Sequence, residues 1–272
     1  MNDENQMRPS EASEETGSIY QRNKVMRKVG EDEKLPFTVH LEELRWRLIY
    51  CFVTVLLTFF VFYFFSEYLF QLVREPLGTD LVFLAPTEAF FVYLKLALYF
   101  AIIISVPMLL YQSWEFVAPG LLNLERKYSG SFVVFGTVFF AIGASFCYFV
   151  VLPYGLQFLI SYGGEGLTPM ISVGNYISFV FKLIITFGLI FEMPIVIVFL
   201  TKLGFVTPET LSSSRPYMIV GSFVVASILT PPDIFTQIVM AGPIILLFEA
   251  SLIISRFFIA KPLSDDEDAE ND

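Results

Sequence analysis

The chain is short of the residues on which most enzymes and metalloproteins depend. It has one histidine, His40, and two cysteines, Cys51 and Cys147, among 272 residues. Its sequence contains no Gly-rich phosphate-binding loop and no Cys/His spacing typical of a zinc or haem site. A Ser-His or Cys-His nucleophile pair inside an apolar segment is also not available. We therefore expect no catalytic residues, no metal and no cofactor.

A positive net charge is also lacking, since the formal net charge is -10. Residues 1–35 contain eight acids and six bases, and residues 260–272 contain six acids and one base. Both segments are poor in apolar residues, so they can bury too little surface to offset chain entropy. We expect disordered acidic tails at 1–35 and 260–272, a membrane domain at 36–259, and no nucleic-acid partner.

Apolar surface is abundant. Hydrophobic residues make up 55% of the chain, which has 31 Phe and a mean hydropathy of +0.65, more than a soluble domain of this length could bury. A bilayer-spanning helix needs about 20 mostly apolar residues. Six segments meet or approach this length, and they lie near 48–69, 89–112, 130–153, 176–201, 216–230 and 238–256.

The predicted spans differ in length and regularity. The fifth and sixth are short, and a helix of about 15 residues reaches only about 22 Å, less than the usual hydrocarbon thickness. Pro107, Pro194 and Pro243 interrupt spans two, four and six, where each is expected to kink the helix. Lys and Arg residues outside the spans number fourteen on one side and one, Arg74, on the other, which predicts that both termini are cytoplasmic.

Carboxylates gather on the predicted cytoplasmic side. Glu42 and Glu43 precede the first span, and Glu125 lies in the first cytoplasmic loop. Two or more carboxylates at one membrane surface could bind a cationic peptide, because a guanidinium pairs with a carboxylate through two hydrogen bonds. The alternative is pairing within the helix, of Glu43 with Arg47 and of Glu42 with Arg45.

Other polar residues fall inside or beside the spans. Glu192 lies near the middle of the fourth, where an ionised side chain is costly, so we expect it to face protein, water or a bound partner. The alternative is a neutral, hydrogen-bonded structural glutamate. Lys95 and Lys182 could reach toward the membrane surface or pair with an acid. Asp233 and Gln237, at the start of the last span, could simply cap the helix.

Five short motifs follow one another in order along the six spans. They are His40-Leu41-Glu42-Glu43-Leu44-Arg45-Trp46-Arg47-Leu48, Trp114-Glu115-Phe116 through Pro119 to Glu125-Arg126, Phe191-Glu192-Met193-Pro194, Arg215-Pro216-Tyr217, and Thr230-Pro231-Pro232-Asp233 with Gln237. Together they resemble the motifs of the TatC family, the core receptor of the twin-arginine protein translocase. The resemblance covers about residues 36–260.

The resemblance implies an all-α polytopic membrane protein with six transmembrane helices in a concave, glove-like arrangement. It implies that Glu43 and Glu125 bind the paired arginines of a signal peptide, and that Glu192 lies in an intramembrane groove against which the signal peptide and partner helices pack. Further positions match the family in structural or partner-contact roles: Arg45, Pro76, Phe116, Tyr148, Asp233 and Gln237.

These observations predict a receptor and scaffold rather than an enzyme, in the cytoplasmic (inner) membrane. The resemblance implies that it exports folded proteins using the proton gradient. The implied partners are TatA- and TatB-type single-span subunits, the signal peptides of the cargo, membrane lipid and further copies of the chain. The alternative is a secondary transporter or ion channel with a midplane site formed by Lys95, Lys182 and Glu192. That alternative leaves the surface motifs around Glu43 and Glu125 without a role.

Overall fold

The computed structural model describes residues 37–117, 129–161, 169–202, 204–230 and 234–259. By its internal contacts the chain divides into two units, Met1–Trp46 and Arg47–Asp272, and the boundary falls inside the first described helix. The predicted disordered tails lie outside the described residues, as do Glu125 and Asp233.

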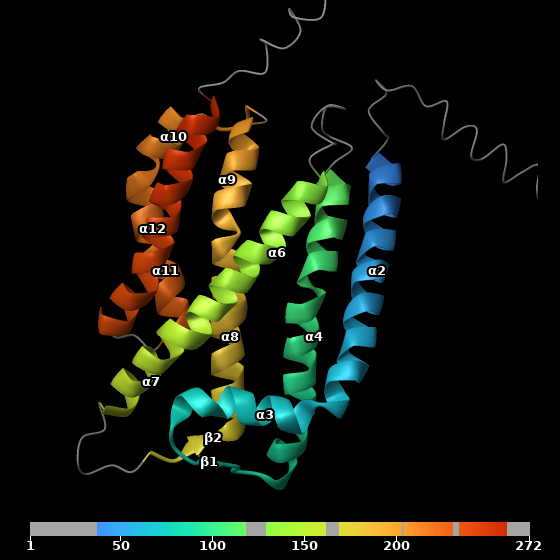
Figure 1. The fold of residues 1–272 in the computed structure, drawn as a ribbon, viewed down its shortest axis with the longest axis vertical. Helices are drawn as coiled ribbons and strands as arrows, with labels where there is room; N and C mark the ends of the chain where they lie inside the picture. The colour runs from blue at the N-terminus through green and yellow to red at the C-terminus, as the bar shows by residue number, and fades with distance from the viewer. Residues whose placement is uncertain (1–36, 118–128, 162–168, 203, 231–233, 260–272) are drawn as a thin grey trace, which may run out of the picture. The chain divides into compact units, whose positions relative to one another are not determined.

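The predicted all-α polytopic fold is confirmed. Five helical segments in the described part are long and apolar enough to cross a membrane, and a sixth apolar helix is shorter (Figure 1). They are formed by α2 (Phe37–Phe64), α4 (Pro86–Val117), α6 (Ser129–Phe146) continued by η3 (Cys147–Val151) and α7 (Leu152–Ser161), α8 (Val173–Phe191) continued by α9 (Met193–Lys202), α11 (Arg215–Leu229), and α12 (Ile234–Ile259).

The two last spans differ from each other in length. Helix α11 has 15 residues and is short, as predicted. Helix α12 has 26 residues, so the prediction of a short sixth span is wrong. The helix runs from Ile234 to Ile259, so it extends beyond the predicted run 238–256 at both ends, and its first turn includes the polar residues Thr236 and Gln237. A hydropathy scan omits such polar turns although they are helical.

The three prolines predicted to kink spans two, four and six differ in whether the helix continues past them. Helices α4 and α12 continue through Pro107 and Pro243 without a break. The fourth span does break, because α8 ends at Phe191 and α9 begins at Met193, just before Pro194. The carbonyl of Glu192 accepts hydrogen bonds from the amides of Ile195 and Val196, both at 3.1 Å, so the chain resumes a helix at once.

The core of the second unit lies where α4, α6 and α8 pack together. The rings of Tyr99 and Phe181 stack with centroids 4.6 Å apart, and Phe181 is almost fully buried. Helices α6 and α8 approach closely at Gly143, where a Cβ atom would lie 2.6 Å from the carbonyl oxygen of Phe187. Only glycine fits at that contact, which explains the small residues in this part of α6.

One end of the second unit carries what we call the cap, formed by α3 (Ser66–Arg74), η1 (Glu75–Leu77), β1 (Leu81–Val82) and β2 (Ile171–Ser172) (Figure 1). The two strands pair in parallel, with Leu81 opposite Ile171. The hydroxyls of Tyr148 and Tyr176 donate to the carbonyls of Leu72 and Val73, each at 2.8 Å. Two membrane spans thus hold the last turn of α3.

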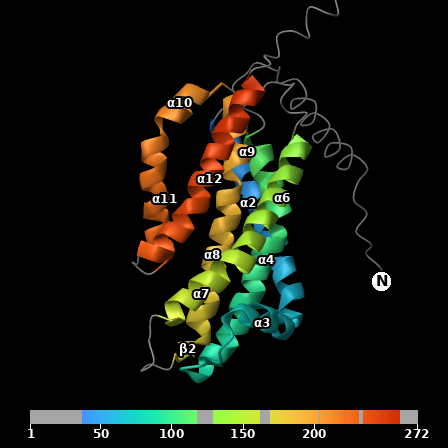
Figure 2. The ribbon, with the colours of Figure 1, turned by 60° about the vertical axis from the view of Figure 1, so that its left-hand side comes forward.

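A hairpin of α11 and α12, preceded by α10 (Pro208–Ser213), packs on α9 through α12 (Figure 2). Arg215, the first residue of α11, joins Glu249 of α12. Its Nη2 donates to Oε2 at 2.9 Å. Its Nε lies 2.8 Å from Oε1, but no hydrogen bond forms there because the N–H is poorly aligned, so that contact is purely ionic.

Candidate functional site

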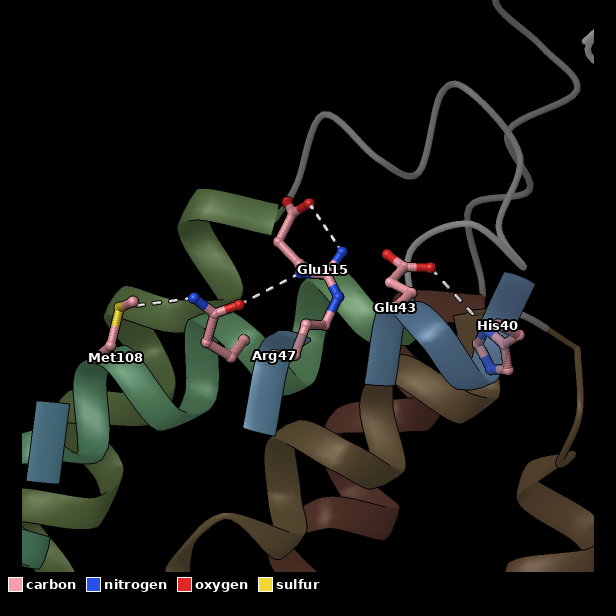
Figure 3. Close-up of polar contacts among 6 residues, drawn as sticks. His40, Glu43, Arg47, Met108 and Glu115 are labelled. Carbon is pink, nitrogen blue, oxygen red and sulfur yellow. Dashed lines mark hydrogen bonds and ion pairs between the residues drawn. The ribbon is translucent and has the colours of Figure 1, made fainter. Parts of the chain in front are cut away.

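The first candidate carboxylate lies in the first turns of α2, within the first unit. The Glu43 side chain is 25% exposed, and its Oε2 lies 3.9 Å from Nδ1 of His40, three residues earlier on the helix (Figure 3). This separation exceeds hydrogen-bond length, so the contact is ionic only when the imidazole is protonated. Arg45 is exposed on the same helix. Helix α2 has no acidic residue in its first turn.

The second unit begins with another polar group, centred on Arg47. Its Nη1 donates to Oε1 of Gln112 at 3.3 Å, and its Nη2 lies 3.9 Å from Oε2 of Glu115 (Figure 3). Gln112 is itself held by Met108, one turn earlier on α4, through a 4.0 Å contact to the sulfur. The start of the first span and the end of the second are thereby joined by charge-assisted contacts.

Aromatic side chains fix the end of α4 that carries Glu115. The adjacent Trp114 is only 3% exposed. Its ring stacks on Phe132 of α6, with centroids 4.2 Å apart, and meets Phe199 of α9 edge-on at 4.4 Å. This cluster buries one side of the helix end, so Glu115 is presented on a rigid support.

Glu192, which we predicted to line an intramembrane groove, lies in the break between α8 and α9. The residue is 7% exposed, and neither carboxylate oxygen has a hydrogen-bond partner among the described residues. The carboxylate fits against α6 because Gly136 has no side chain: a Cβ there would lie 3.0 Å from Oε2 and 2.9 Å from Cδ1 of Leu110. The glycine leaves room for the acid, and the neighbouring helices then cover it.

The other predicted positions are dispersed over the fold. Tyr148 lies in the π-helical turn η3 and contacts the cap, and Pro76 lies in η1 within the cap. Phe116 is in the last turn of α4, and Gln237 is in the first turn of α12. These residues do not form one constellation with Glu192. For Glu125 and Asp233, the structure gives no position.

Among the residues that the structure describes, Lys95, Lys182 and Glu192 are not joined in the midplane site that the transporter alternative requires. Lys95 donates to the hydroxyl of Ser178 at 3.2 Å, and Lys182 donates to the carbonyl of Ile228 at 2.5 Å. Glu192 is ten residues beyond Lys182 along the fourth span and contacts neither lysine in the described contacts. No group of three or more His, Cys, Asp or Glu residues in the described segments could hold a metal ion.

Sequence reasoning missed three acids that the structure pairs. Glu115 meets Arg47, and Glu249 meets Arg215. Glu88, in the first turn of α4, accepts from the amides of Leu84 at 2.6 Å and Gly174 at 2.8 Å, and from the hydroxyl of Ser172. Glu249 carried a signal that was overlooked, because an acid inside an apolar span needs a partner.

The fold and these residues define a multi-pass, all-α membrane protein whose spans contain paired charges and one buried acid. The family model described as "Sec-independent protein translocase protein (TatC)" matches residues 39–243. The chain belongs to the TatC family, as its motifs predicted.

Relatives in the family are similar over nearly their whole length. The Desulforapulum autotrophicum protein named Sec-independent protein translocase protein TatC is 41% identical over 245 residues, which cover 88% of this chain and 91% of the relative. The Escherichia coli K12 protein of the same name is 38% identical over 242 residues, covering 87% and 94%. A solved structure named "Crystal Structure of Twin Arginine Translocase Receptor- TatC" is 40% identical, with a TM-score of 0.72 over 80% of this chain and 98% of that one.

Proposed function

We propose that this protein is the signal-peptide receptor and scaffold of a twin-arginine translocase, which exports folded proteins across the cytoplasmic membrane using the proton gradient. It binds the paired arginines of the signal through Glu43 and Glu125. It assembles with TatA- and TatB-type single-span subunits and with further copies of itself, and both termini are cytoplasmic. Membership in the TatC family and similarity to a solved twin-arginine translocase receptor support the proposal.

The observation that carries the proposal is the position of Glu43. Its carboxylate stands just before a long apolar span, and its side chain is 25% exposed. A guanidinium that reaches this carboxylate could form two charge-assisted hydrogen bonds with its two oxygens. Lys and Arg residues concentrate on the same predicted side of the membrane, which supports a cytoplasmic location.

Peptide binding to the purified full-length protein tests the proposal. We expect a labelled twin-arginine peptide to bind at least tenfold more weakly to Glu43→Gln and to Glu125→Gln, because a hydrogen bond to a charged group is worth about 1.5–3 kcal/mol. A twin-lysine peptide should bind the unaltered protein more weakly, since it lacks the planar fork.

Glu42→Gln is the matched control, because it removes the same charge one residue away, from an exposed side chain. Its affinity for the twin-arginine peptide should stay within about twofold of the unaltered protein, as expected for an exposed charge. Equal affinities of Glu42→Gln and Glu43→Gln would contradict the assignment of Glu43.

Glu192 fits the proposal as a contact for a partner helix. Its two carboxylate oxygens are buried and lack a donor among the described residues, so a donor brought by another helix would gain a strong hydrogen bond in an apolar medium. In the assembled complex, Glu192→Gln should weaken co-purification of the single-span subunits. The same change should leave binding of the twin-arginine peptide to the isolated protein less affected than Glu43→Gln does.

A further inference from the structure

Two lysines inside the membrane spans carry charges that the structure leaves uncompensated. Lys95 of α4 bonds to the hydroxyl of Ser178, and Lys182 of α8 bonds to the backbone carbonyl of Ile228. Both partners are neutral, and within the described part of the chain neither lysine forms an ion pair with an acid. Both side chains are exposed on the surface of the second unit. An exposed ammonium at this depth in hydrocarbon is costly without an anion.

The two lysines lie at nearly the same depth. The carboxylate of Glu88 accepts from the amide of Gly174 at 2.8 Å, which fixes the start of α4 against the start of α8. Lys95 follows Glu88 by seven residues and Lys182 follows Gly174 by eight. At a rise of about 1.5 Å per residue, the two positions are about 10 and 12 Å along their helices. Because α4 and α8 pack together, the charges belong to one band of the surface.

The hydrogen bond of Lys182 shows that the α11–α12 hairpin ends at this same depth. Ile228 lies in the last turn of α11, and the residue four positions later is Pro232, which has no N–H to donate. The lysine ammonium supplies the missing donor and a positive charge at the helix C-terminus. Figure 1 shows that the end of α11 and the start of α12 lie well short of the cap, beside the middle of α8 rather than its start.

Helix α11 has only 15 residues, about 22 Å, so we expect the hydrocarbon layer to be thinner beside it. The side chain of Lys95 extends toward the cap, because Ser178 is only four residues beyond Gly174 on α8. Asn175 and Ser178 share a face of α8 with Lys182, at i, i+3 and i+7, and form a polar stripe leading from the cap to the two ammonium groups. Lipid headgroups on the cap side can follow this stripe.

We propose that Lys95 and Lys182 form a binding site for the phosphate of an anionic phospholipid in the leaflet on the cap side, with Ser178, whose hydroxyl donates to the carbonyl of Gly174, holding the Lys95 ammonium in place. Each ammonium has three N–H donors, and one of the three is used in the described contacts. The remaining donors bind phosphate oxygens, and the acyl chains lie over the exposed apolar side chains of α4. A lipid phosphate is favoured over a partner's carboxylate because both the hairpin end and the reach of Lys95 place the charges toward the headgroups.

Native mass spectrometry of the purified full-length protein tests this site. The unaltered protein should bind phosphatidylglycerol more tightly than phosphatidylcholine. Lys95→Gln should weaken phosphatidylglycerol binding about fivefold, Lys182→Gln about fivefold, and the double variant on the order of twenty-fold, with phosphatidylcholine binding unchanged. Arginine at both positions should restore the preference. Inorganic phosphate should not displace the lipid, because it lacks the acyl chains.

Arg74→Gln is the matched control, because it also removes a cation on the cap side. That cation is already paired, with Nη2 of Arg74 2.9 Å from Oδ1 of Asp80, so the lipid preference should not change. Lys182→Gln also removes the hydrogen bond to Ile228 and could loosen the hairpin. Lys95→Gln leaves that bond intact, so its effect on lipid binding tests the site without this complication. An unchanged preference in Lys95→Gln would overturn the proposal. A second result would also overturn it: no preference for phosphatidylglycerol, with the lysines protected from acylating reagents only when a single-span subunit is added. The ligand of the two lysines would then be a carboxylate of that subunit.

Discussion

Replacing Gly136 by alanine tests whether the space beside Glu192 is as tight as the structure shows. The added Cβ would lie 2.9 Å from Cδ1 of Leu110, 3.0 Å from Oε2 of Glu192 and 3.4 Å from Oε1. Normal contacts of this kind need about 3.4–4 Å, so the two side chains must move within a packed interior, at a cost of about 1–3 kcal/mol. Alanine also gains about 1 kcal/mol in helix propensity, which partly hides that cost.

Gly221→Ala is the matched control. Gly221 lies inside α11, and nothing lies within 4 Å of the position its Cβ would occupy. This substitution should therefore show the helix gain alone. In detergent, Gly136→Ala should unfold at a lower temperature than Gly221→Ala, by several degrees, since about 1 kcal/mol corresponds to about 2–4 °C in a domain of 150–250 residues. The intrinsic fluorescence of buried Trp114 reports the transition.

A double-mutant cycle identifies the partner of the clash. Glu192→Ala removes both oxygens, so Gly136→Ala should cost at least about 1 kcal/mol less in that background than in the unaltered protein. The residual cost then reports the contact with Leu110. If Gly136→Ala proves as harmless as Gly221→Ala, or if its cost is the same with and without the carboxylate, the buried position of Glu192 against α6 is refuted.

Three further changes probe the cap and the hairpin. Tyr176→Phe removes the donor to the buried carbonyl of Val73, so thermal unfolding should show a loss of about 1–3 kcal/mol, and faster amide exchange in α3 should accompany it. Glu88→Gln weakens the link between the starts of α4 and α8, so the amide of Gly174 should exchange faster by hydrogen–deuterium exchange, while amides in α12 should not. Arg215→Lys keeps the charge but loses the planar guanidinium that contacts both oxygens of Glu249. Because both side chains are more than a third exposed, the free energy of unfolding, measured by thermal unfolding, should fall by no more than about 1 kcal/mol.

The number and order of the membrane spans could be predicted from the sequence, because each span is a long apolar run between polar segments. The residues at which the spans end could not be predicted. Helix α12 begins with a turn that contains polar residues, and α4 and α12 continue through their prolines, since neighbouring packing outweighs the loss of one backbone hydrogen bond. The β1–β2 pair joins segments about ninety residues apart, with only two residues in each strand, and no local pattern of that length predicts pairing.

The candidate site was predictable in kind but not in detail. An acid next to or inside an apolar run is energetically costly, so its position indicates a candidate functional residue. This reasoning identified Glu43 and Glu192. The same reasoning did not indicate that Arg47 meets Gln112 and Glu115, because that contact depends on which helix ends are neighbours. Nor could the sequence show that Glu192 is covered, since this depends on a glycine of another helix, Gly136, facing it.

The polar groups within the spans differ in how their bonding capacity is met, and this difference separates structural from functional roles. Arg215 and Glu249 pair with each other between α11 and α12, and both side chains stay partly exposed. Lys182 satisfies a carbonyl that proline leaves without a donor, but retains its charge. Glu192 is the opposite case: its own backbone amide and carbonyl are hydrogen-bonded, whereas its carboxylate, buried at the helix break, meets no donor in the described chain. A buried carboxylate without a donor costs stability, and the partner helix proposed above would remove that cost by supplying one.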